Sequence, residues 1–127
     1  MLINRNSFTR KERLKSDKSI SELFESGYSL TIHPIRLIYR LKTPATSVPV
    51  KIGFVVPKKN FKRAVDRNLL KRRMREAYRL NKSILRSEIS TGFEIMLVYQ
   101  GQEAEDYDKI SATMVLLLKK LALRSFR

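Results

Sequence analysis

Basic residues crowd one stretch in the middle of the chain. Eleven lysines and arginines stand between positions 58 and 82, where Asp66 and Glu76 are the only acids. The basic residues are Lys58, Lys59, Lys62, Arg63, Arg67, Lys71, Arg72, Arg73, Arg75, Arg79 and Lys82. A guanidinium group can donate two hydrogen bonds to one phosphate, and a nucleic-acid backbone repeats such phosphates at regular intervals. The stretch therefore predicts binding to a polyanion.

The same stretch has the periodicity of a two-faced helix. We predict a helix from about Asn60 to Arg86, with Asn60 as its N-cap. At about 100° per residue, one half of this helix is apolar and consists of Val65, Leu69, Leu70, Met74, Ala77, Leu80 and Ile84. The other half carries Arg67, Asn68, Lys71, Arg72, Arg75, Arg79 and Lys82. Arg73 is the exception, because it projects into the apolar half. We expect the apolar half to pack against a sheet.

The spacing of the cations argues against an ordinary solvated helix face. Arg67, Lys71, Arg75 and Arg79 follow one another at intervals of four residues. Like charges at this spacing repel each other, whereas exposed helices usually alternate acids and bases there. A row that costs stability in the free protein favours an external polyanionic partner.

The rest of the chain predicts a small α+β domain with the order α-β-β-β-α-β-α. We expect helices at 19–27, 60–86 and 109–123, two strands within 28–42, and further strands at 50–57 and 93–99. In the strand at 50–57, the run from Ile52 to Val56 looks buried on both faces, and the strand at 93–99 is a second well-buried one. The inner face of the last helix consists of Ile110, Met114, Leu117 and Leu121. We predict one RNA-binding domain over residues 1–127, of which 1–12 form a flexible basic arm.

Composition restricts the classes of function. The 127 residues include 27 Lys and Arg against 12 Asp and Glu, so the net charge is +15. Nucleic acid is the leading partner for such a chain, and an anionic membrane surface is the lesser one. The absence of cysteine excludes disulfides and thiolate metal sites. Because the N-terminus has no signal-peptide pattern and the longest apolar run is short, we expect a soluble cytoplasmic protein without membrane contact.

Catalytic chemistry by the protein itself has little support. His33, the only histidine, precedes a proline between two strands, where a turn residue is expected more often than a general base. The acids Glu103, Glu105, Asp106 and Asp108 predict a solvated loop rather than a metal site. We therefore assign no catalytic residue and no metal ligand to the chain.

The central stretch resembles the bacterial ribonuclease P protein family. The carrying motifs are GFVVPKKN from Gly53 and RAVDRNLLKRRMREAYRL from Arg63. In that family a strand ends in Lys-Lys, and Arg-Asn-Arg, Lys-Arg and Arg-Glu pairs follow on a helix. Weaker matches at Phe8, Arg13-Leu14, Phe24, Gly27 and 93–99 extend the resemblance over most of the chain. One departure is Leu69, which stands where the family usually has a basic residue, and Arg73 stands where it often has an apolar one.

The resemblance implies a fold and a division of labour. The fold is an α/β sandwich of the ribosomal protein S5 domain 2-like type, with a left-handed βαβ crossover. The implied partner is the catalytic RNA of ribonuclease P, which cleaves precursor tRNA with Mg²⁺ held mainly by the RNA and frees the mature 5′ end. The protein would assist as a subunit of this endoribonuclease by binding the catalytic RNA and the single-stranded 5′ leader.

Two sets of site residues follow from the resemblance and from the charge pattern. For the catalytic RNA we name Lys58, Lys59, Lys62, Arg63, Arg67, Asn68, Lys71, Arg72, Arg75 and Arg79. For the leader, in a cleft between the first helix and a sheet face, we name Ile20, Phe24, Ile35, Leu37 and Tyr39, because apolar and aromatic platforms suit unstacked bases. Ordinary core packing is an equal alternative for Phe24.

Two other functions remain open on the sequence. Charge alone would also suit a nucleic-acid-binding module of another kind, such as a ribosome-associated protein. A stand-alone nuclease would need His33 or the acidic loop to act without RNA.

Overall fold

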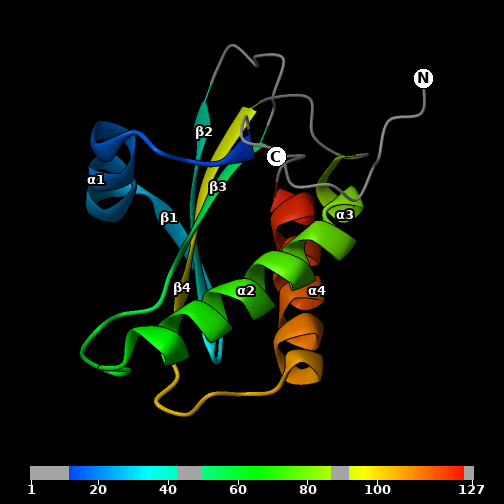
Figure 1. The fold of residues 1–127 in the computed structure, drawn as a ribbon. Helices are drawn as coiled ribbons and strands as arrows, with labels where there is room; N and C mark the ends of the chain where they lie inside the picture. Colours follow the sequence, from blue (N-terminus) through cyan, green and yellow to red (C-terminus); the bar gives the residue numbers. More distant parts are fainter. Residues whose placement is uncertain (1–11, 43–49, 87–91, 125–127) are drawn as a thin grey trace, which may run out of the picture.

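The protein consists of a four-stranded sheet with helices on both faces. A computed structural model describes residues 12–42, 50–86 and 92–124. In chain order the elements are α1 (Asp17–Ser26), β1 (Tyr28–Ile32), β2 (Ile35–Lys42), β3 (Val50–Val55), α2 (Ala64–Asn81), α3 (Ser83–Arg86), β4 (Gly92–Tyr99) and α4 (Tyr107–Arg124). Figure 1 shows α1 on one side of the sheet and α2 with α4 on the other. The predicted α+β order is confirmed, with the short α3 as an addition.

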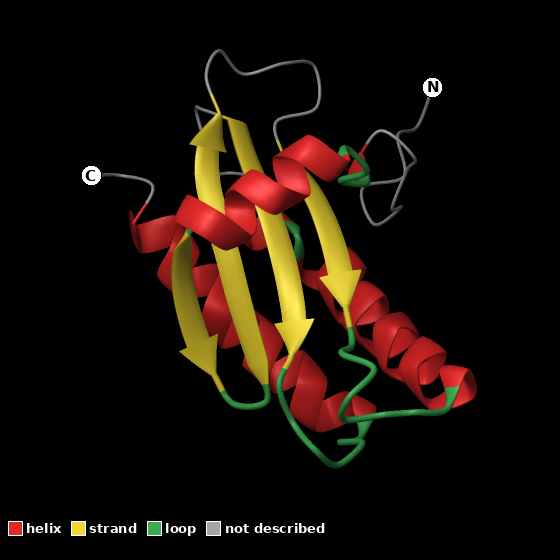
Figure 2. Ribbon diagram, turned by 90° about the vertical axis from the view of Figure 1, so that its left-hand side faces the viewer, coloured by secondary structure: helices red, strands yellow, loops and turns green. Residues whose placement is uncertain are grey.

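The sheet is mixed, and its strands lie in the order β1-β2-β4-β3. Two antiparallel pairs, β1 with β2 and β2 with β4, are followed by the parallel pair of β4 with β3. Figure 2 views the sheet from the α1 side, where β3 and β4 both point downward, β4 lies to the left of β3, and α2 passes behind. A crossover in this sense is left-handed, although nearly all parallel connections are right-handed. The left-handed crossover that the resemblance implied is therefore present.

Alternation along the strands divides the core into two clusters, because successive side chains point to opposite faces. On β2, Leu37 packs in the large cluster with α2 and α4, whereas Ile38 packs in the small cluster beneath α1. Every residue of β4 is buried, as predicted for a central strand covered on both faces. The predicted inner face of α4 is likewise buried: Ile110, Met114, Leu117 and Leu121.

The structure corrects three predictions about the central stretch. Helix α2 begins at Ala64 rather than Asn60, and Arg63 is its N-cap residue without a side-chain capping bond. Asn60 lies in the preceding turn, where its backbone N–H donates to the carbonyl of Pro57 at 3.2 Å. The prediction that the run from Ile52 to Val56 is buried on both faces was wrong in part: Ile52 and Val56 are buried, but β3 is an edge strand and residues 53–55 are partly exposed.

The N-terminal segment meets the end of α2. Residues 1–11 of the predicted arm lie outside the described residues. Glu12 accepts hydrogen bonds from the Nζ atom of Lys82, 3.0 Å from each carboxylate oxygen. Lys82 is only 3% exposed, so its predicted place on the cationic face was wrong. This ion pair and the backbone bond from Leu14 to the carbonyl of Ile52 at 3.0 Å fix the chain beside β3.

Candidate nucleic-acid interface

The inner face of α2 is narrower than the sequence predicts. Leu70, Met74 and Ala77 are completely buried, and Tyr78 joins them at 1% exposed. Val65 and Leu80, which we placed on the same apolar half, are 59% and 44% exposed. At about 100° per residue, Val65 and Leu80 point roughly 140° and 80° away from Leu70, so α4 and the sheet cover only part of the predicted apolar half.

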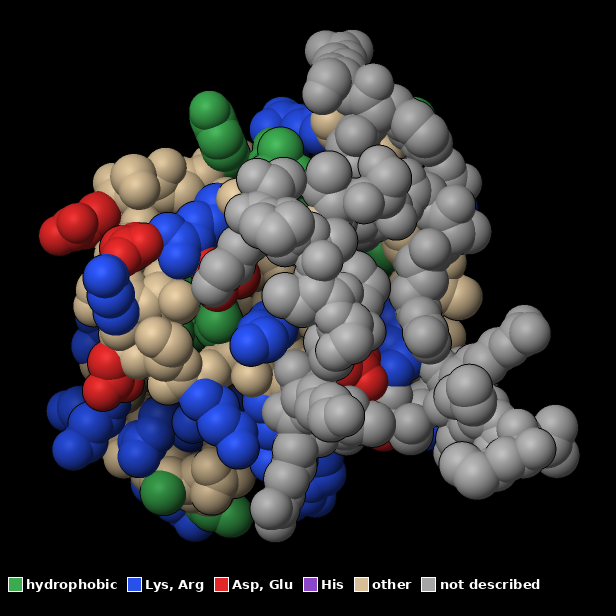
Figure 3. Space-filling view, turned by 90° about the horizontal axis from the view of Figure 1, so that it is seen from above, with side chains coloured by type: hydrophobic (Ala, Val, Ile, Leu, Met, Phe, Trp, Pro, Cys, Tyr) green, Lys and Arg blue, Asp and Glu red, His purple; other side chains and the backbone are tan. Residues whose placement is uncertain are grey.

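The outer side of α2 and the loop before it present the predicted cations. Six of the ten predicted RNA-binding residues are exposed: Lys58, Lys59, Lys62, Arg63, Asn68 and Arg72. The other four, Arg67, Lys71, Arg75 and Arg79, are partly exposed. Figure 3 shows Lys and Arg side chains gathered along the lower edge of the view, which is the side of the molecule that carries α2. We call this set of ten residues the α2 surface.

Two arginines of the α2 surface are held in place by uncharged groups. The Nη1 atom of Arg67 donates to the carbonyls of Phe61 and Lys62, at 2.8 Å each. The guanidinium carbon of Arg75 lies 6.0 Å from the centroid of the Phe54 ring, which suits a cation–π contact. Neither contact neutralises the cation, so both arginines keep their full charge while losing side-chain freedom. Preorganised cations of this kind lose less entropy when they meet a phosphate.

Arg79 differs from its neighbours because it has an acidic partner. Its Nε donates to the Glu76 carboxylate at 3.0 Å, and its Nη2 contacts the other carboxylate oxygen. This hydrogen bond holds the pKa of Glu76 below its usual value and raises the pKa of Arg79. The row is therefore not uniformly repulsive, and its cationic character is strongest before Arg79.

Arg73, the basic residue on the predicted apolar half of the helix, contacts the loop between β4 and α4. Its Nη1 donates to the backbone carbonyl of Glu105 at 2.6 Å. The Tyr99 hydroxyl donates to the carbonyl of Glu103 at 2.6 Å and accepts from the N–H of Glu105 at 3.0 Å. Burial raises the pKa of this hydroxyl. Arg73 and Tyr99 together fix the acidic loop between β4 and α4, so part of the guanidinium of Arg73 is used within the fold.

Three of the predicted leader-binding residues are on the wrong face of the sheet. Ile35 and Leu37 are completely buried and Tyr39 is 8% exposed, and all three belong to the large cluster with α2 and α4. The physical reason is the alternation of β2, which points its odd-numbered residues away from α1. The prediction of these three residues as a cleft beside α1 was therefore wrong.

The α1 side of the sheet has a different set of residues. Ile20 packs at the margin of the small cluster, and Phe24 is 46% exposed, so core packing does not account for Phe24. The β2 side chains on this face are those of Arg36, Ile38 and Arg40, the even-numbered residues that our prediction missed. The sequence held a signal for them, because the odd residues of β2 are all apolar and suit the larger core.

Arg40 joins α1 to the sheet. Its Nε donates to Glu94 of β4 at 2.6 Å, and its Nη1 contacts the carboxylate of Glu22 on α1. Glu94 is 2% exposed. The hydrogen bond from Arg40 holds the pKa of Glu22 below its usual value. We call these three residues the Arg40 network.

Metal-binding clusters and membrane-spanning helices are absent from the described residues. Among residues 12–42, 50–86 and 92–124, no three His, Cys, Asp or Glu side chains gather closely enough to hold a metal ion. His33 lies at a polar pocket with Glu103 and Glu105. Within the described ranges, none of the helices combines the length and the apolar character needed to cross a bilayer.

Known proteins share this sequence pattern. The family model for ribonuclease P matches residues 8–122. The ribonuclease P protein component of Porphyromonas gingivalis is 40% identical over 77 residues, which are 61% of this chain and 56% of that protein. The corresponding protein of Petrotoga mobilis is 33% identical over 120 residues, 91% of this chain and 95% of that protein. The matched part therefore spans little more than half of the first relative and nearly all of the second.

The fold agrees with these sequence matches. The ribonuclease P protein of Thermotoga maritima superposes with a TM-score of 0.68 at 29% identity, covering 86% of this chain and 96% of that one. The family match includes α1, the whole sheet, the basic helix and nearly all of α4. With sequence and fold in agreement over that length, the chain belongs to the ribonuclease P protein family.

Proposed function

We propose that the chain binds the catalytic RNA of ribonuclease P through the α2 surface. The observation that carries this proposal is the two-sided build of α2, with Leu70 and Met74 completely buried on one side and Lys71 and Arg72 turned away from them. A helix fixed by its own packing presents its cations without ordering a loop first. Contacts of this kind go mainly to phosphates, so binding should weaken steeply as salt rises.

The second part of the proposal concerns the 5′ leader of precursor tRNA. The face of the sheet beside α1 offers an exposed aromatic ring at Phe24, the partly buried Ile20, and Arg36 from β2. An aromatic ring beside a cation suits an unpaired base and its phosphate. The leader would therefore lie on the α1 side, where Ile38 rather than Leu37 underlies it.

Catalysis in this proposal belongs to the RNA subunit of the cytoplasmic holoenzyme. The charge of the protein, +15 over the whole chain, attracts phosphates and would repel a free divalent cation. We expect the RNA to hold the Mg²⁺ ions needed for cleavage, and the protein to lower the Mg²⁺ concentration at which the RNA folds and binds its substrate.

The test is reconstitution. Purified protein is mixed with bacterial ribonuclease P RNA at low Mg²⁺, and cleavage of a precursor tRNA is measured against the RNA alone. The double variant Lys71→Ala/Arg72→Ala should lose most of the gain. Its matched control is Lys119→Ala/Lys120→Ala, which removes two adjacent exposed lysines from α4. Failure of the wild-type protein to increase cleavage would contradict the proposal, as would equal losses in the two double variants.

A further inference from the structure

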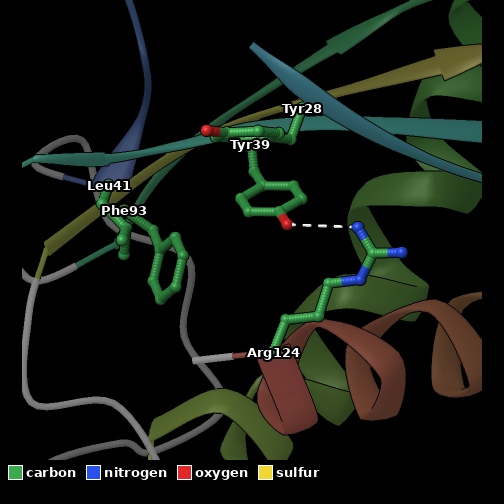
Figure 4. Close-up of a pocket in the computed structure, with 5 residues that line it drawn as sticks. All are labelled: Tyr28, Tyr39, Leu41, Phe93 and Arg124. Atoms are coloured by element: carbon green, nitrogen blue, oxygen red, sulfur yellow. Dashed lines mark hydrogen bonds between the residues drawn. The ribbon is translucent and has the colours of Figure 1, made fainter. Parts of the chain in front are cut away.

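An aromatic pocket lies on the sheet away from the β3 edge that contacts α2. Its lining residues are Tyr28 of β1, Tyr39 and Leu41 of β2, Phe93 of β4 and Arg124 in the last turn of α4 (Figure 4). The strand register brings them together, because Tyr28 pairs with Tyr39 and Leu41 pairs with Phe93. The cavity has a volume of about 110 Å³.

The rings of the pocket form a row across three strands. The centroids of Tyr28 and Tyr39 are 5.8 Å apart, and those of Tyr39 and Phe93 are 6.0 Å apart. Phe93 and Tyr39 are 2% and 8% exposed and make the floor, whereas Tyr28 is 68% exposed and Leu41 is 55% exposed. The exposed side chains of Tyr28 and Leu41 form an apolar surface at one end of the sheet. This surface has no partner in the described part of the fold.

Arg124 gives the pocket its charge. Its Nη1 donates to the Tyr39 hydroxyl at 3.3 Å, which holds the guanidinium beside the rings (Figure 4). Arg124 is exposed, so its guanidinium can be reached from solvent. The lining has no acidic residue among the described residues. The pocket thus combines π faces with one cation, in a protein whose net charge is +15.

We infer that this pocket binds one unpaired nucleobase of an RNA strand, with Arg124 contacting the adjoining phosphate. Base stacking on aromatic side chains beside cations is the usual way in which proteins hold single strands. At about 110 Å³ the cavity is smaller than the roughly 150 Å³ that encloses a benzene ring, so a base would lie partly outside the cavity and stack on the exposed ring of Tyr28. The carbon-rich lining and the positive charge together favour a nucleotide over a neutral apolar ligand.

The pocket is separate from both surfaces of the proposed function. It lies on the face of the sheet that α4 covers, because its β2 residues Tyr39 and Leu41 point away from α1. It also lies at β1, β2 and β4, whereas α2 contacts β3. A strand bound here would be a third RNA contact, at a place that the cations of α2 do not reach.

The experiment uses the full chain and a single-stranded pentaadenylate. The chain has five tyrosines and no tryptophan, so base stacking is detected as quenching of tyrosine fluorescence, and the affinity is checked by anisotropy of labelled RNA. Tyr28→Leu and Arg124→Gln are compared with Tyr28→Phe, which keeps the ring. Each is also made in the Lys71→Ala/Arg72→Ala background, so that binding to α2 does not hide the result.

The expected results separate stacking from other contacts. Tyr28→Leu should weaken pentaadenylate binding by about fivefold to a hundredfold, and Tyr28→Phe should bind within a factor of about two. Arg124→Gln should lower both the affinity and its salt dependence. Leu116→Ala, which removes an exposed leucine from α4, is the control and should change nothing.

Two results would overturn the inference. One is wild-type affinity in both Tyr28→Leu and Arg124→Gln, with unchanged quenching. The other is equal loss in Tyr28→Phe and Tyr28→Leu, which would point to the hydroxyl group rather than the ring. Since Tyr28 is largely exposed, both variants should keep the melting temperature of the wild type. Loss of the pocket contact with intact α2 binding leaves the proposed function standing, so the two failures are distinguishable.

Discussion

Basic side chains in this molecule occur in two contrasting settings. Between α1 and the sheet, Arg40 contacts the two carboxylates of Glu22 and Glu94. On the α2 surface, Lys71 and Arg72 have no carboxylate partner in the described part of the chain. The first setting is closed, because its charges are satisfied within the fold. The second is open and needs an anion from outside.

The contrast shows which cations composition can identify as functional. Net charge counts Arg40 and Arg72 alike, although Arg40 is paired with two carboxylates and Arg72 is exposed. A pairing partner distinguishes them, and pairing is a property of the folded chain. Lys82 makes the same point within the basic stretch, since its ammonium group is buried and pairs with Glu12.

The largest effect is expected where α2 is fixed. Leu70 is completely buried, so Leu70→Ala should lower the free energy of unfolding by roughly 2–5 kcal/mol through lost burial and the cavity left behind. Urea unfolding measures this change. RNA binding at low temperature, where the variant remains folded, should keep its salt dependence. A Leu70→Ala variant with wild-type stability would show that the inner face of α2 is not packed.

The next effect concerns the closed setting. Arg40→Met removes the guanidinium that pairs with the buried Glu94, and should cost about 3 kcal/mol of stability, at the low end for buried pairs because Arg40 is partly exposed. The double variant Arg40→Met/Glu94→Leu removes both charges and should recover most of the loss. If the double variant unfolds as easily as the single one, the cost comes from lost packing of Arg40 and not from the loss of its charge beside Glu94.

The open setting should respond in binding and not in stability. Arg72→Ala should weaken binding to ribonuclease P RNA by about 1–3 kcal/mol and lower the slope of log affinity against log salt by about one unit. Its melting temperature should stay that of the wild type, because the side chain is exposed. Lys119→Ala on α4 removes the same charge elsewhere and is the control. An unchanged slope for Arg72→Ala would place the binding face away from α2.

Much of this architecture could be predicted from periodicity, and the errors have physical causes. Leu70 and Arg72 fall on opposite sides of α2 as their helical spacing requires. Val65 and Leu80 were expected on the buried side but are exposed, because a wheel gives the direction of each side chain but not how wide a sector of the helix is covered. The width of that sector depends on α4 and the sheet, whose residues lie far from α2 in the sequence.

The larger error was the assignment of the β2 side chains to the two faces of the sheet. A strand in a sheet that is covered on both sides has two inward faces, and the sequence must then show which core is larger. Ile35 and Leu37 lie on the wholly apolar face and hence in the large core, whereas Arg36 and Arg40 mark the face under α1. The aromatic pocket could not be predicted either, since Tyr28, Phe93 and Arg124 meet only through the strand register and α4.

The smallest expected effect is a pH dependence of the free energy of unfolding that arises from Glu22 in the closed setting. The hydrogen bond from Arg40 lowers the pKa of Glu22 from its usual 4.5 in the folded protein. Because the ionised form is favoured in the folded state, the stabilising contribution of Glu22 is complete above pH 4.5 and is lost as the pH falls through the lower folded value. Glu22→Gln should remove this part of the acid dependence.

The measurement is urea unfolding of the wild type and of Glu22→Gln between pH 6 and pH 3, roughly the range over which a carboxyl with a lowered pKa titrates. The two stabilities should converge as the pH falls, because protonation of Glu22 imitates the substitution. Glu25→Gln, which changes an exposed acid on the same helix, is the matched control and should run parallel to the wild type. Stability curves of Glu22→Gln and the wild type that stay parallel to the lowest pH would mean that Glu22 is ionised without depending on Arg40. In that case the closed setting would reduce to the pair of Arg40 and Glu94, and α1 would be held on the sheet by Leu23 and its apolar neighbours alone.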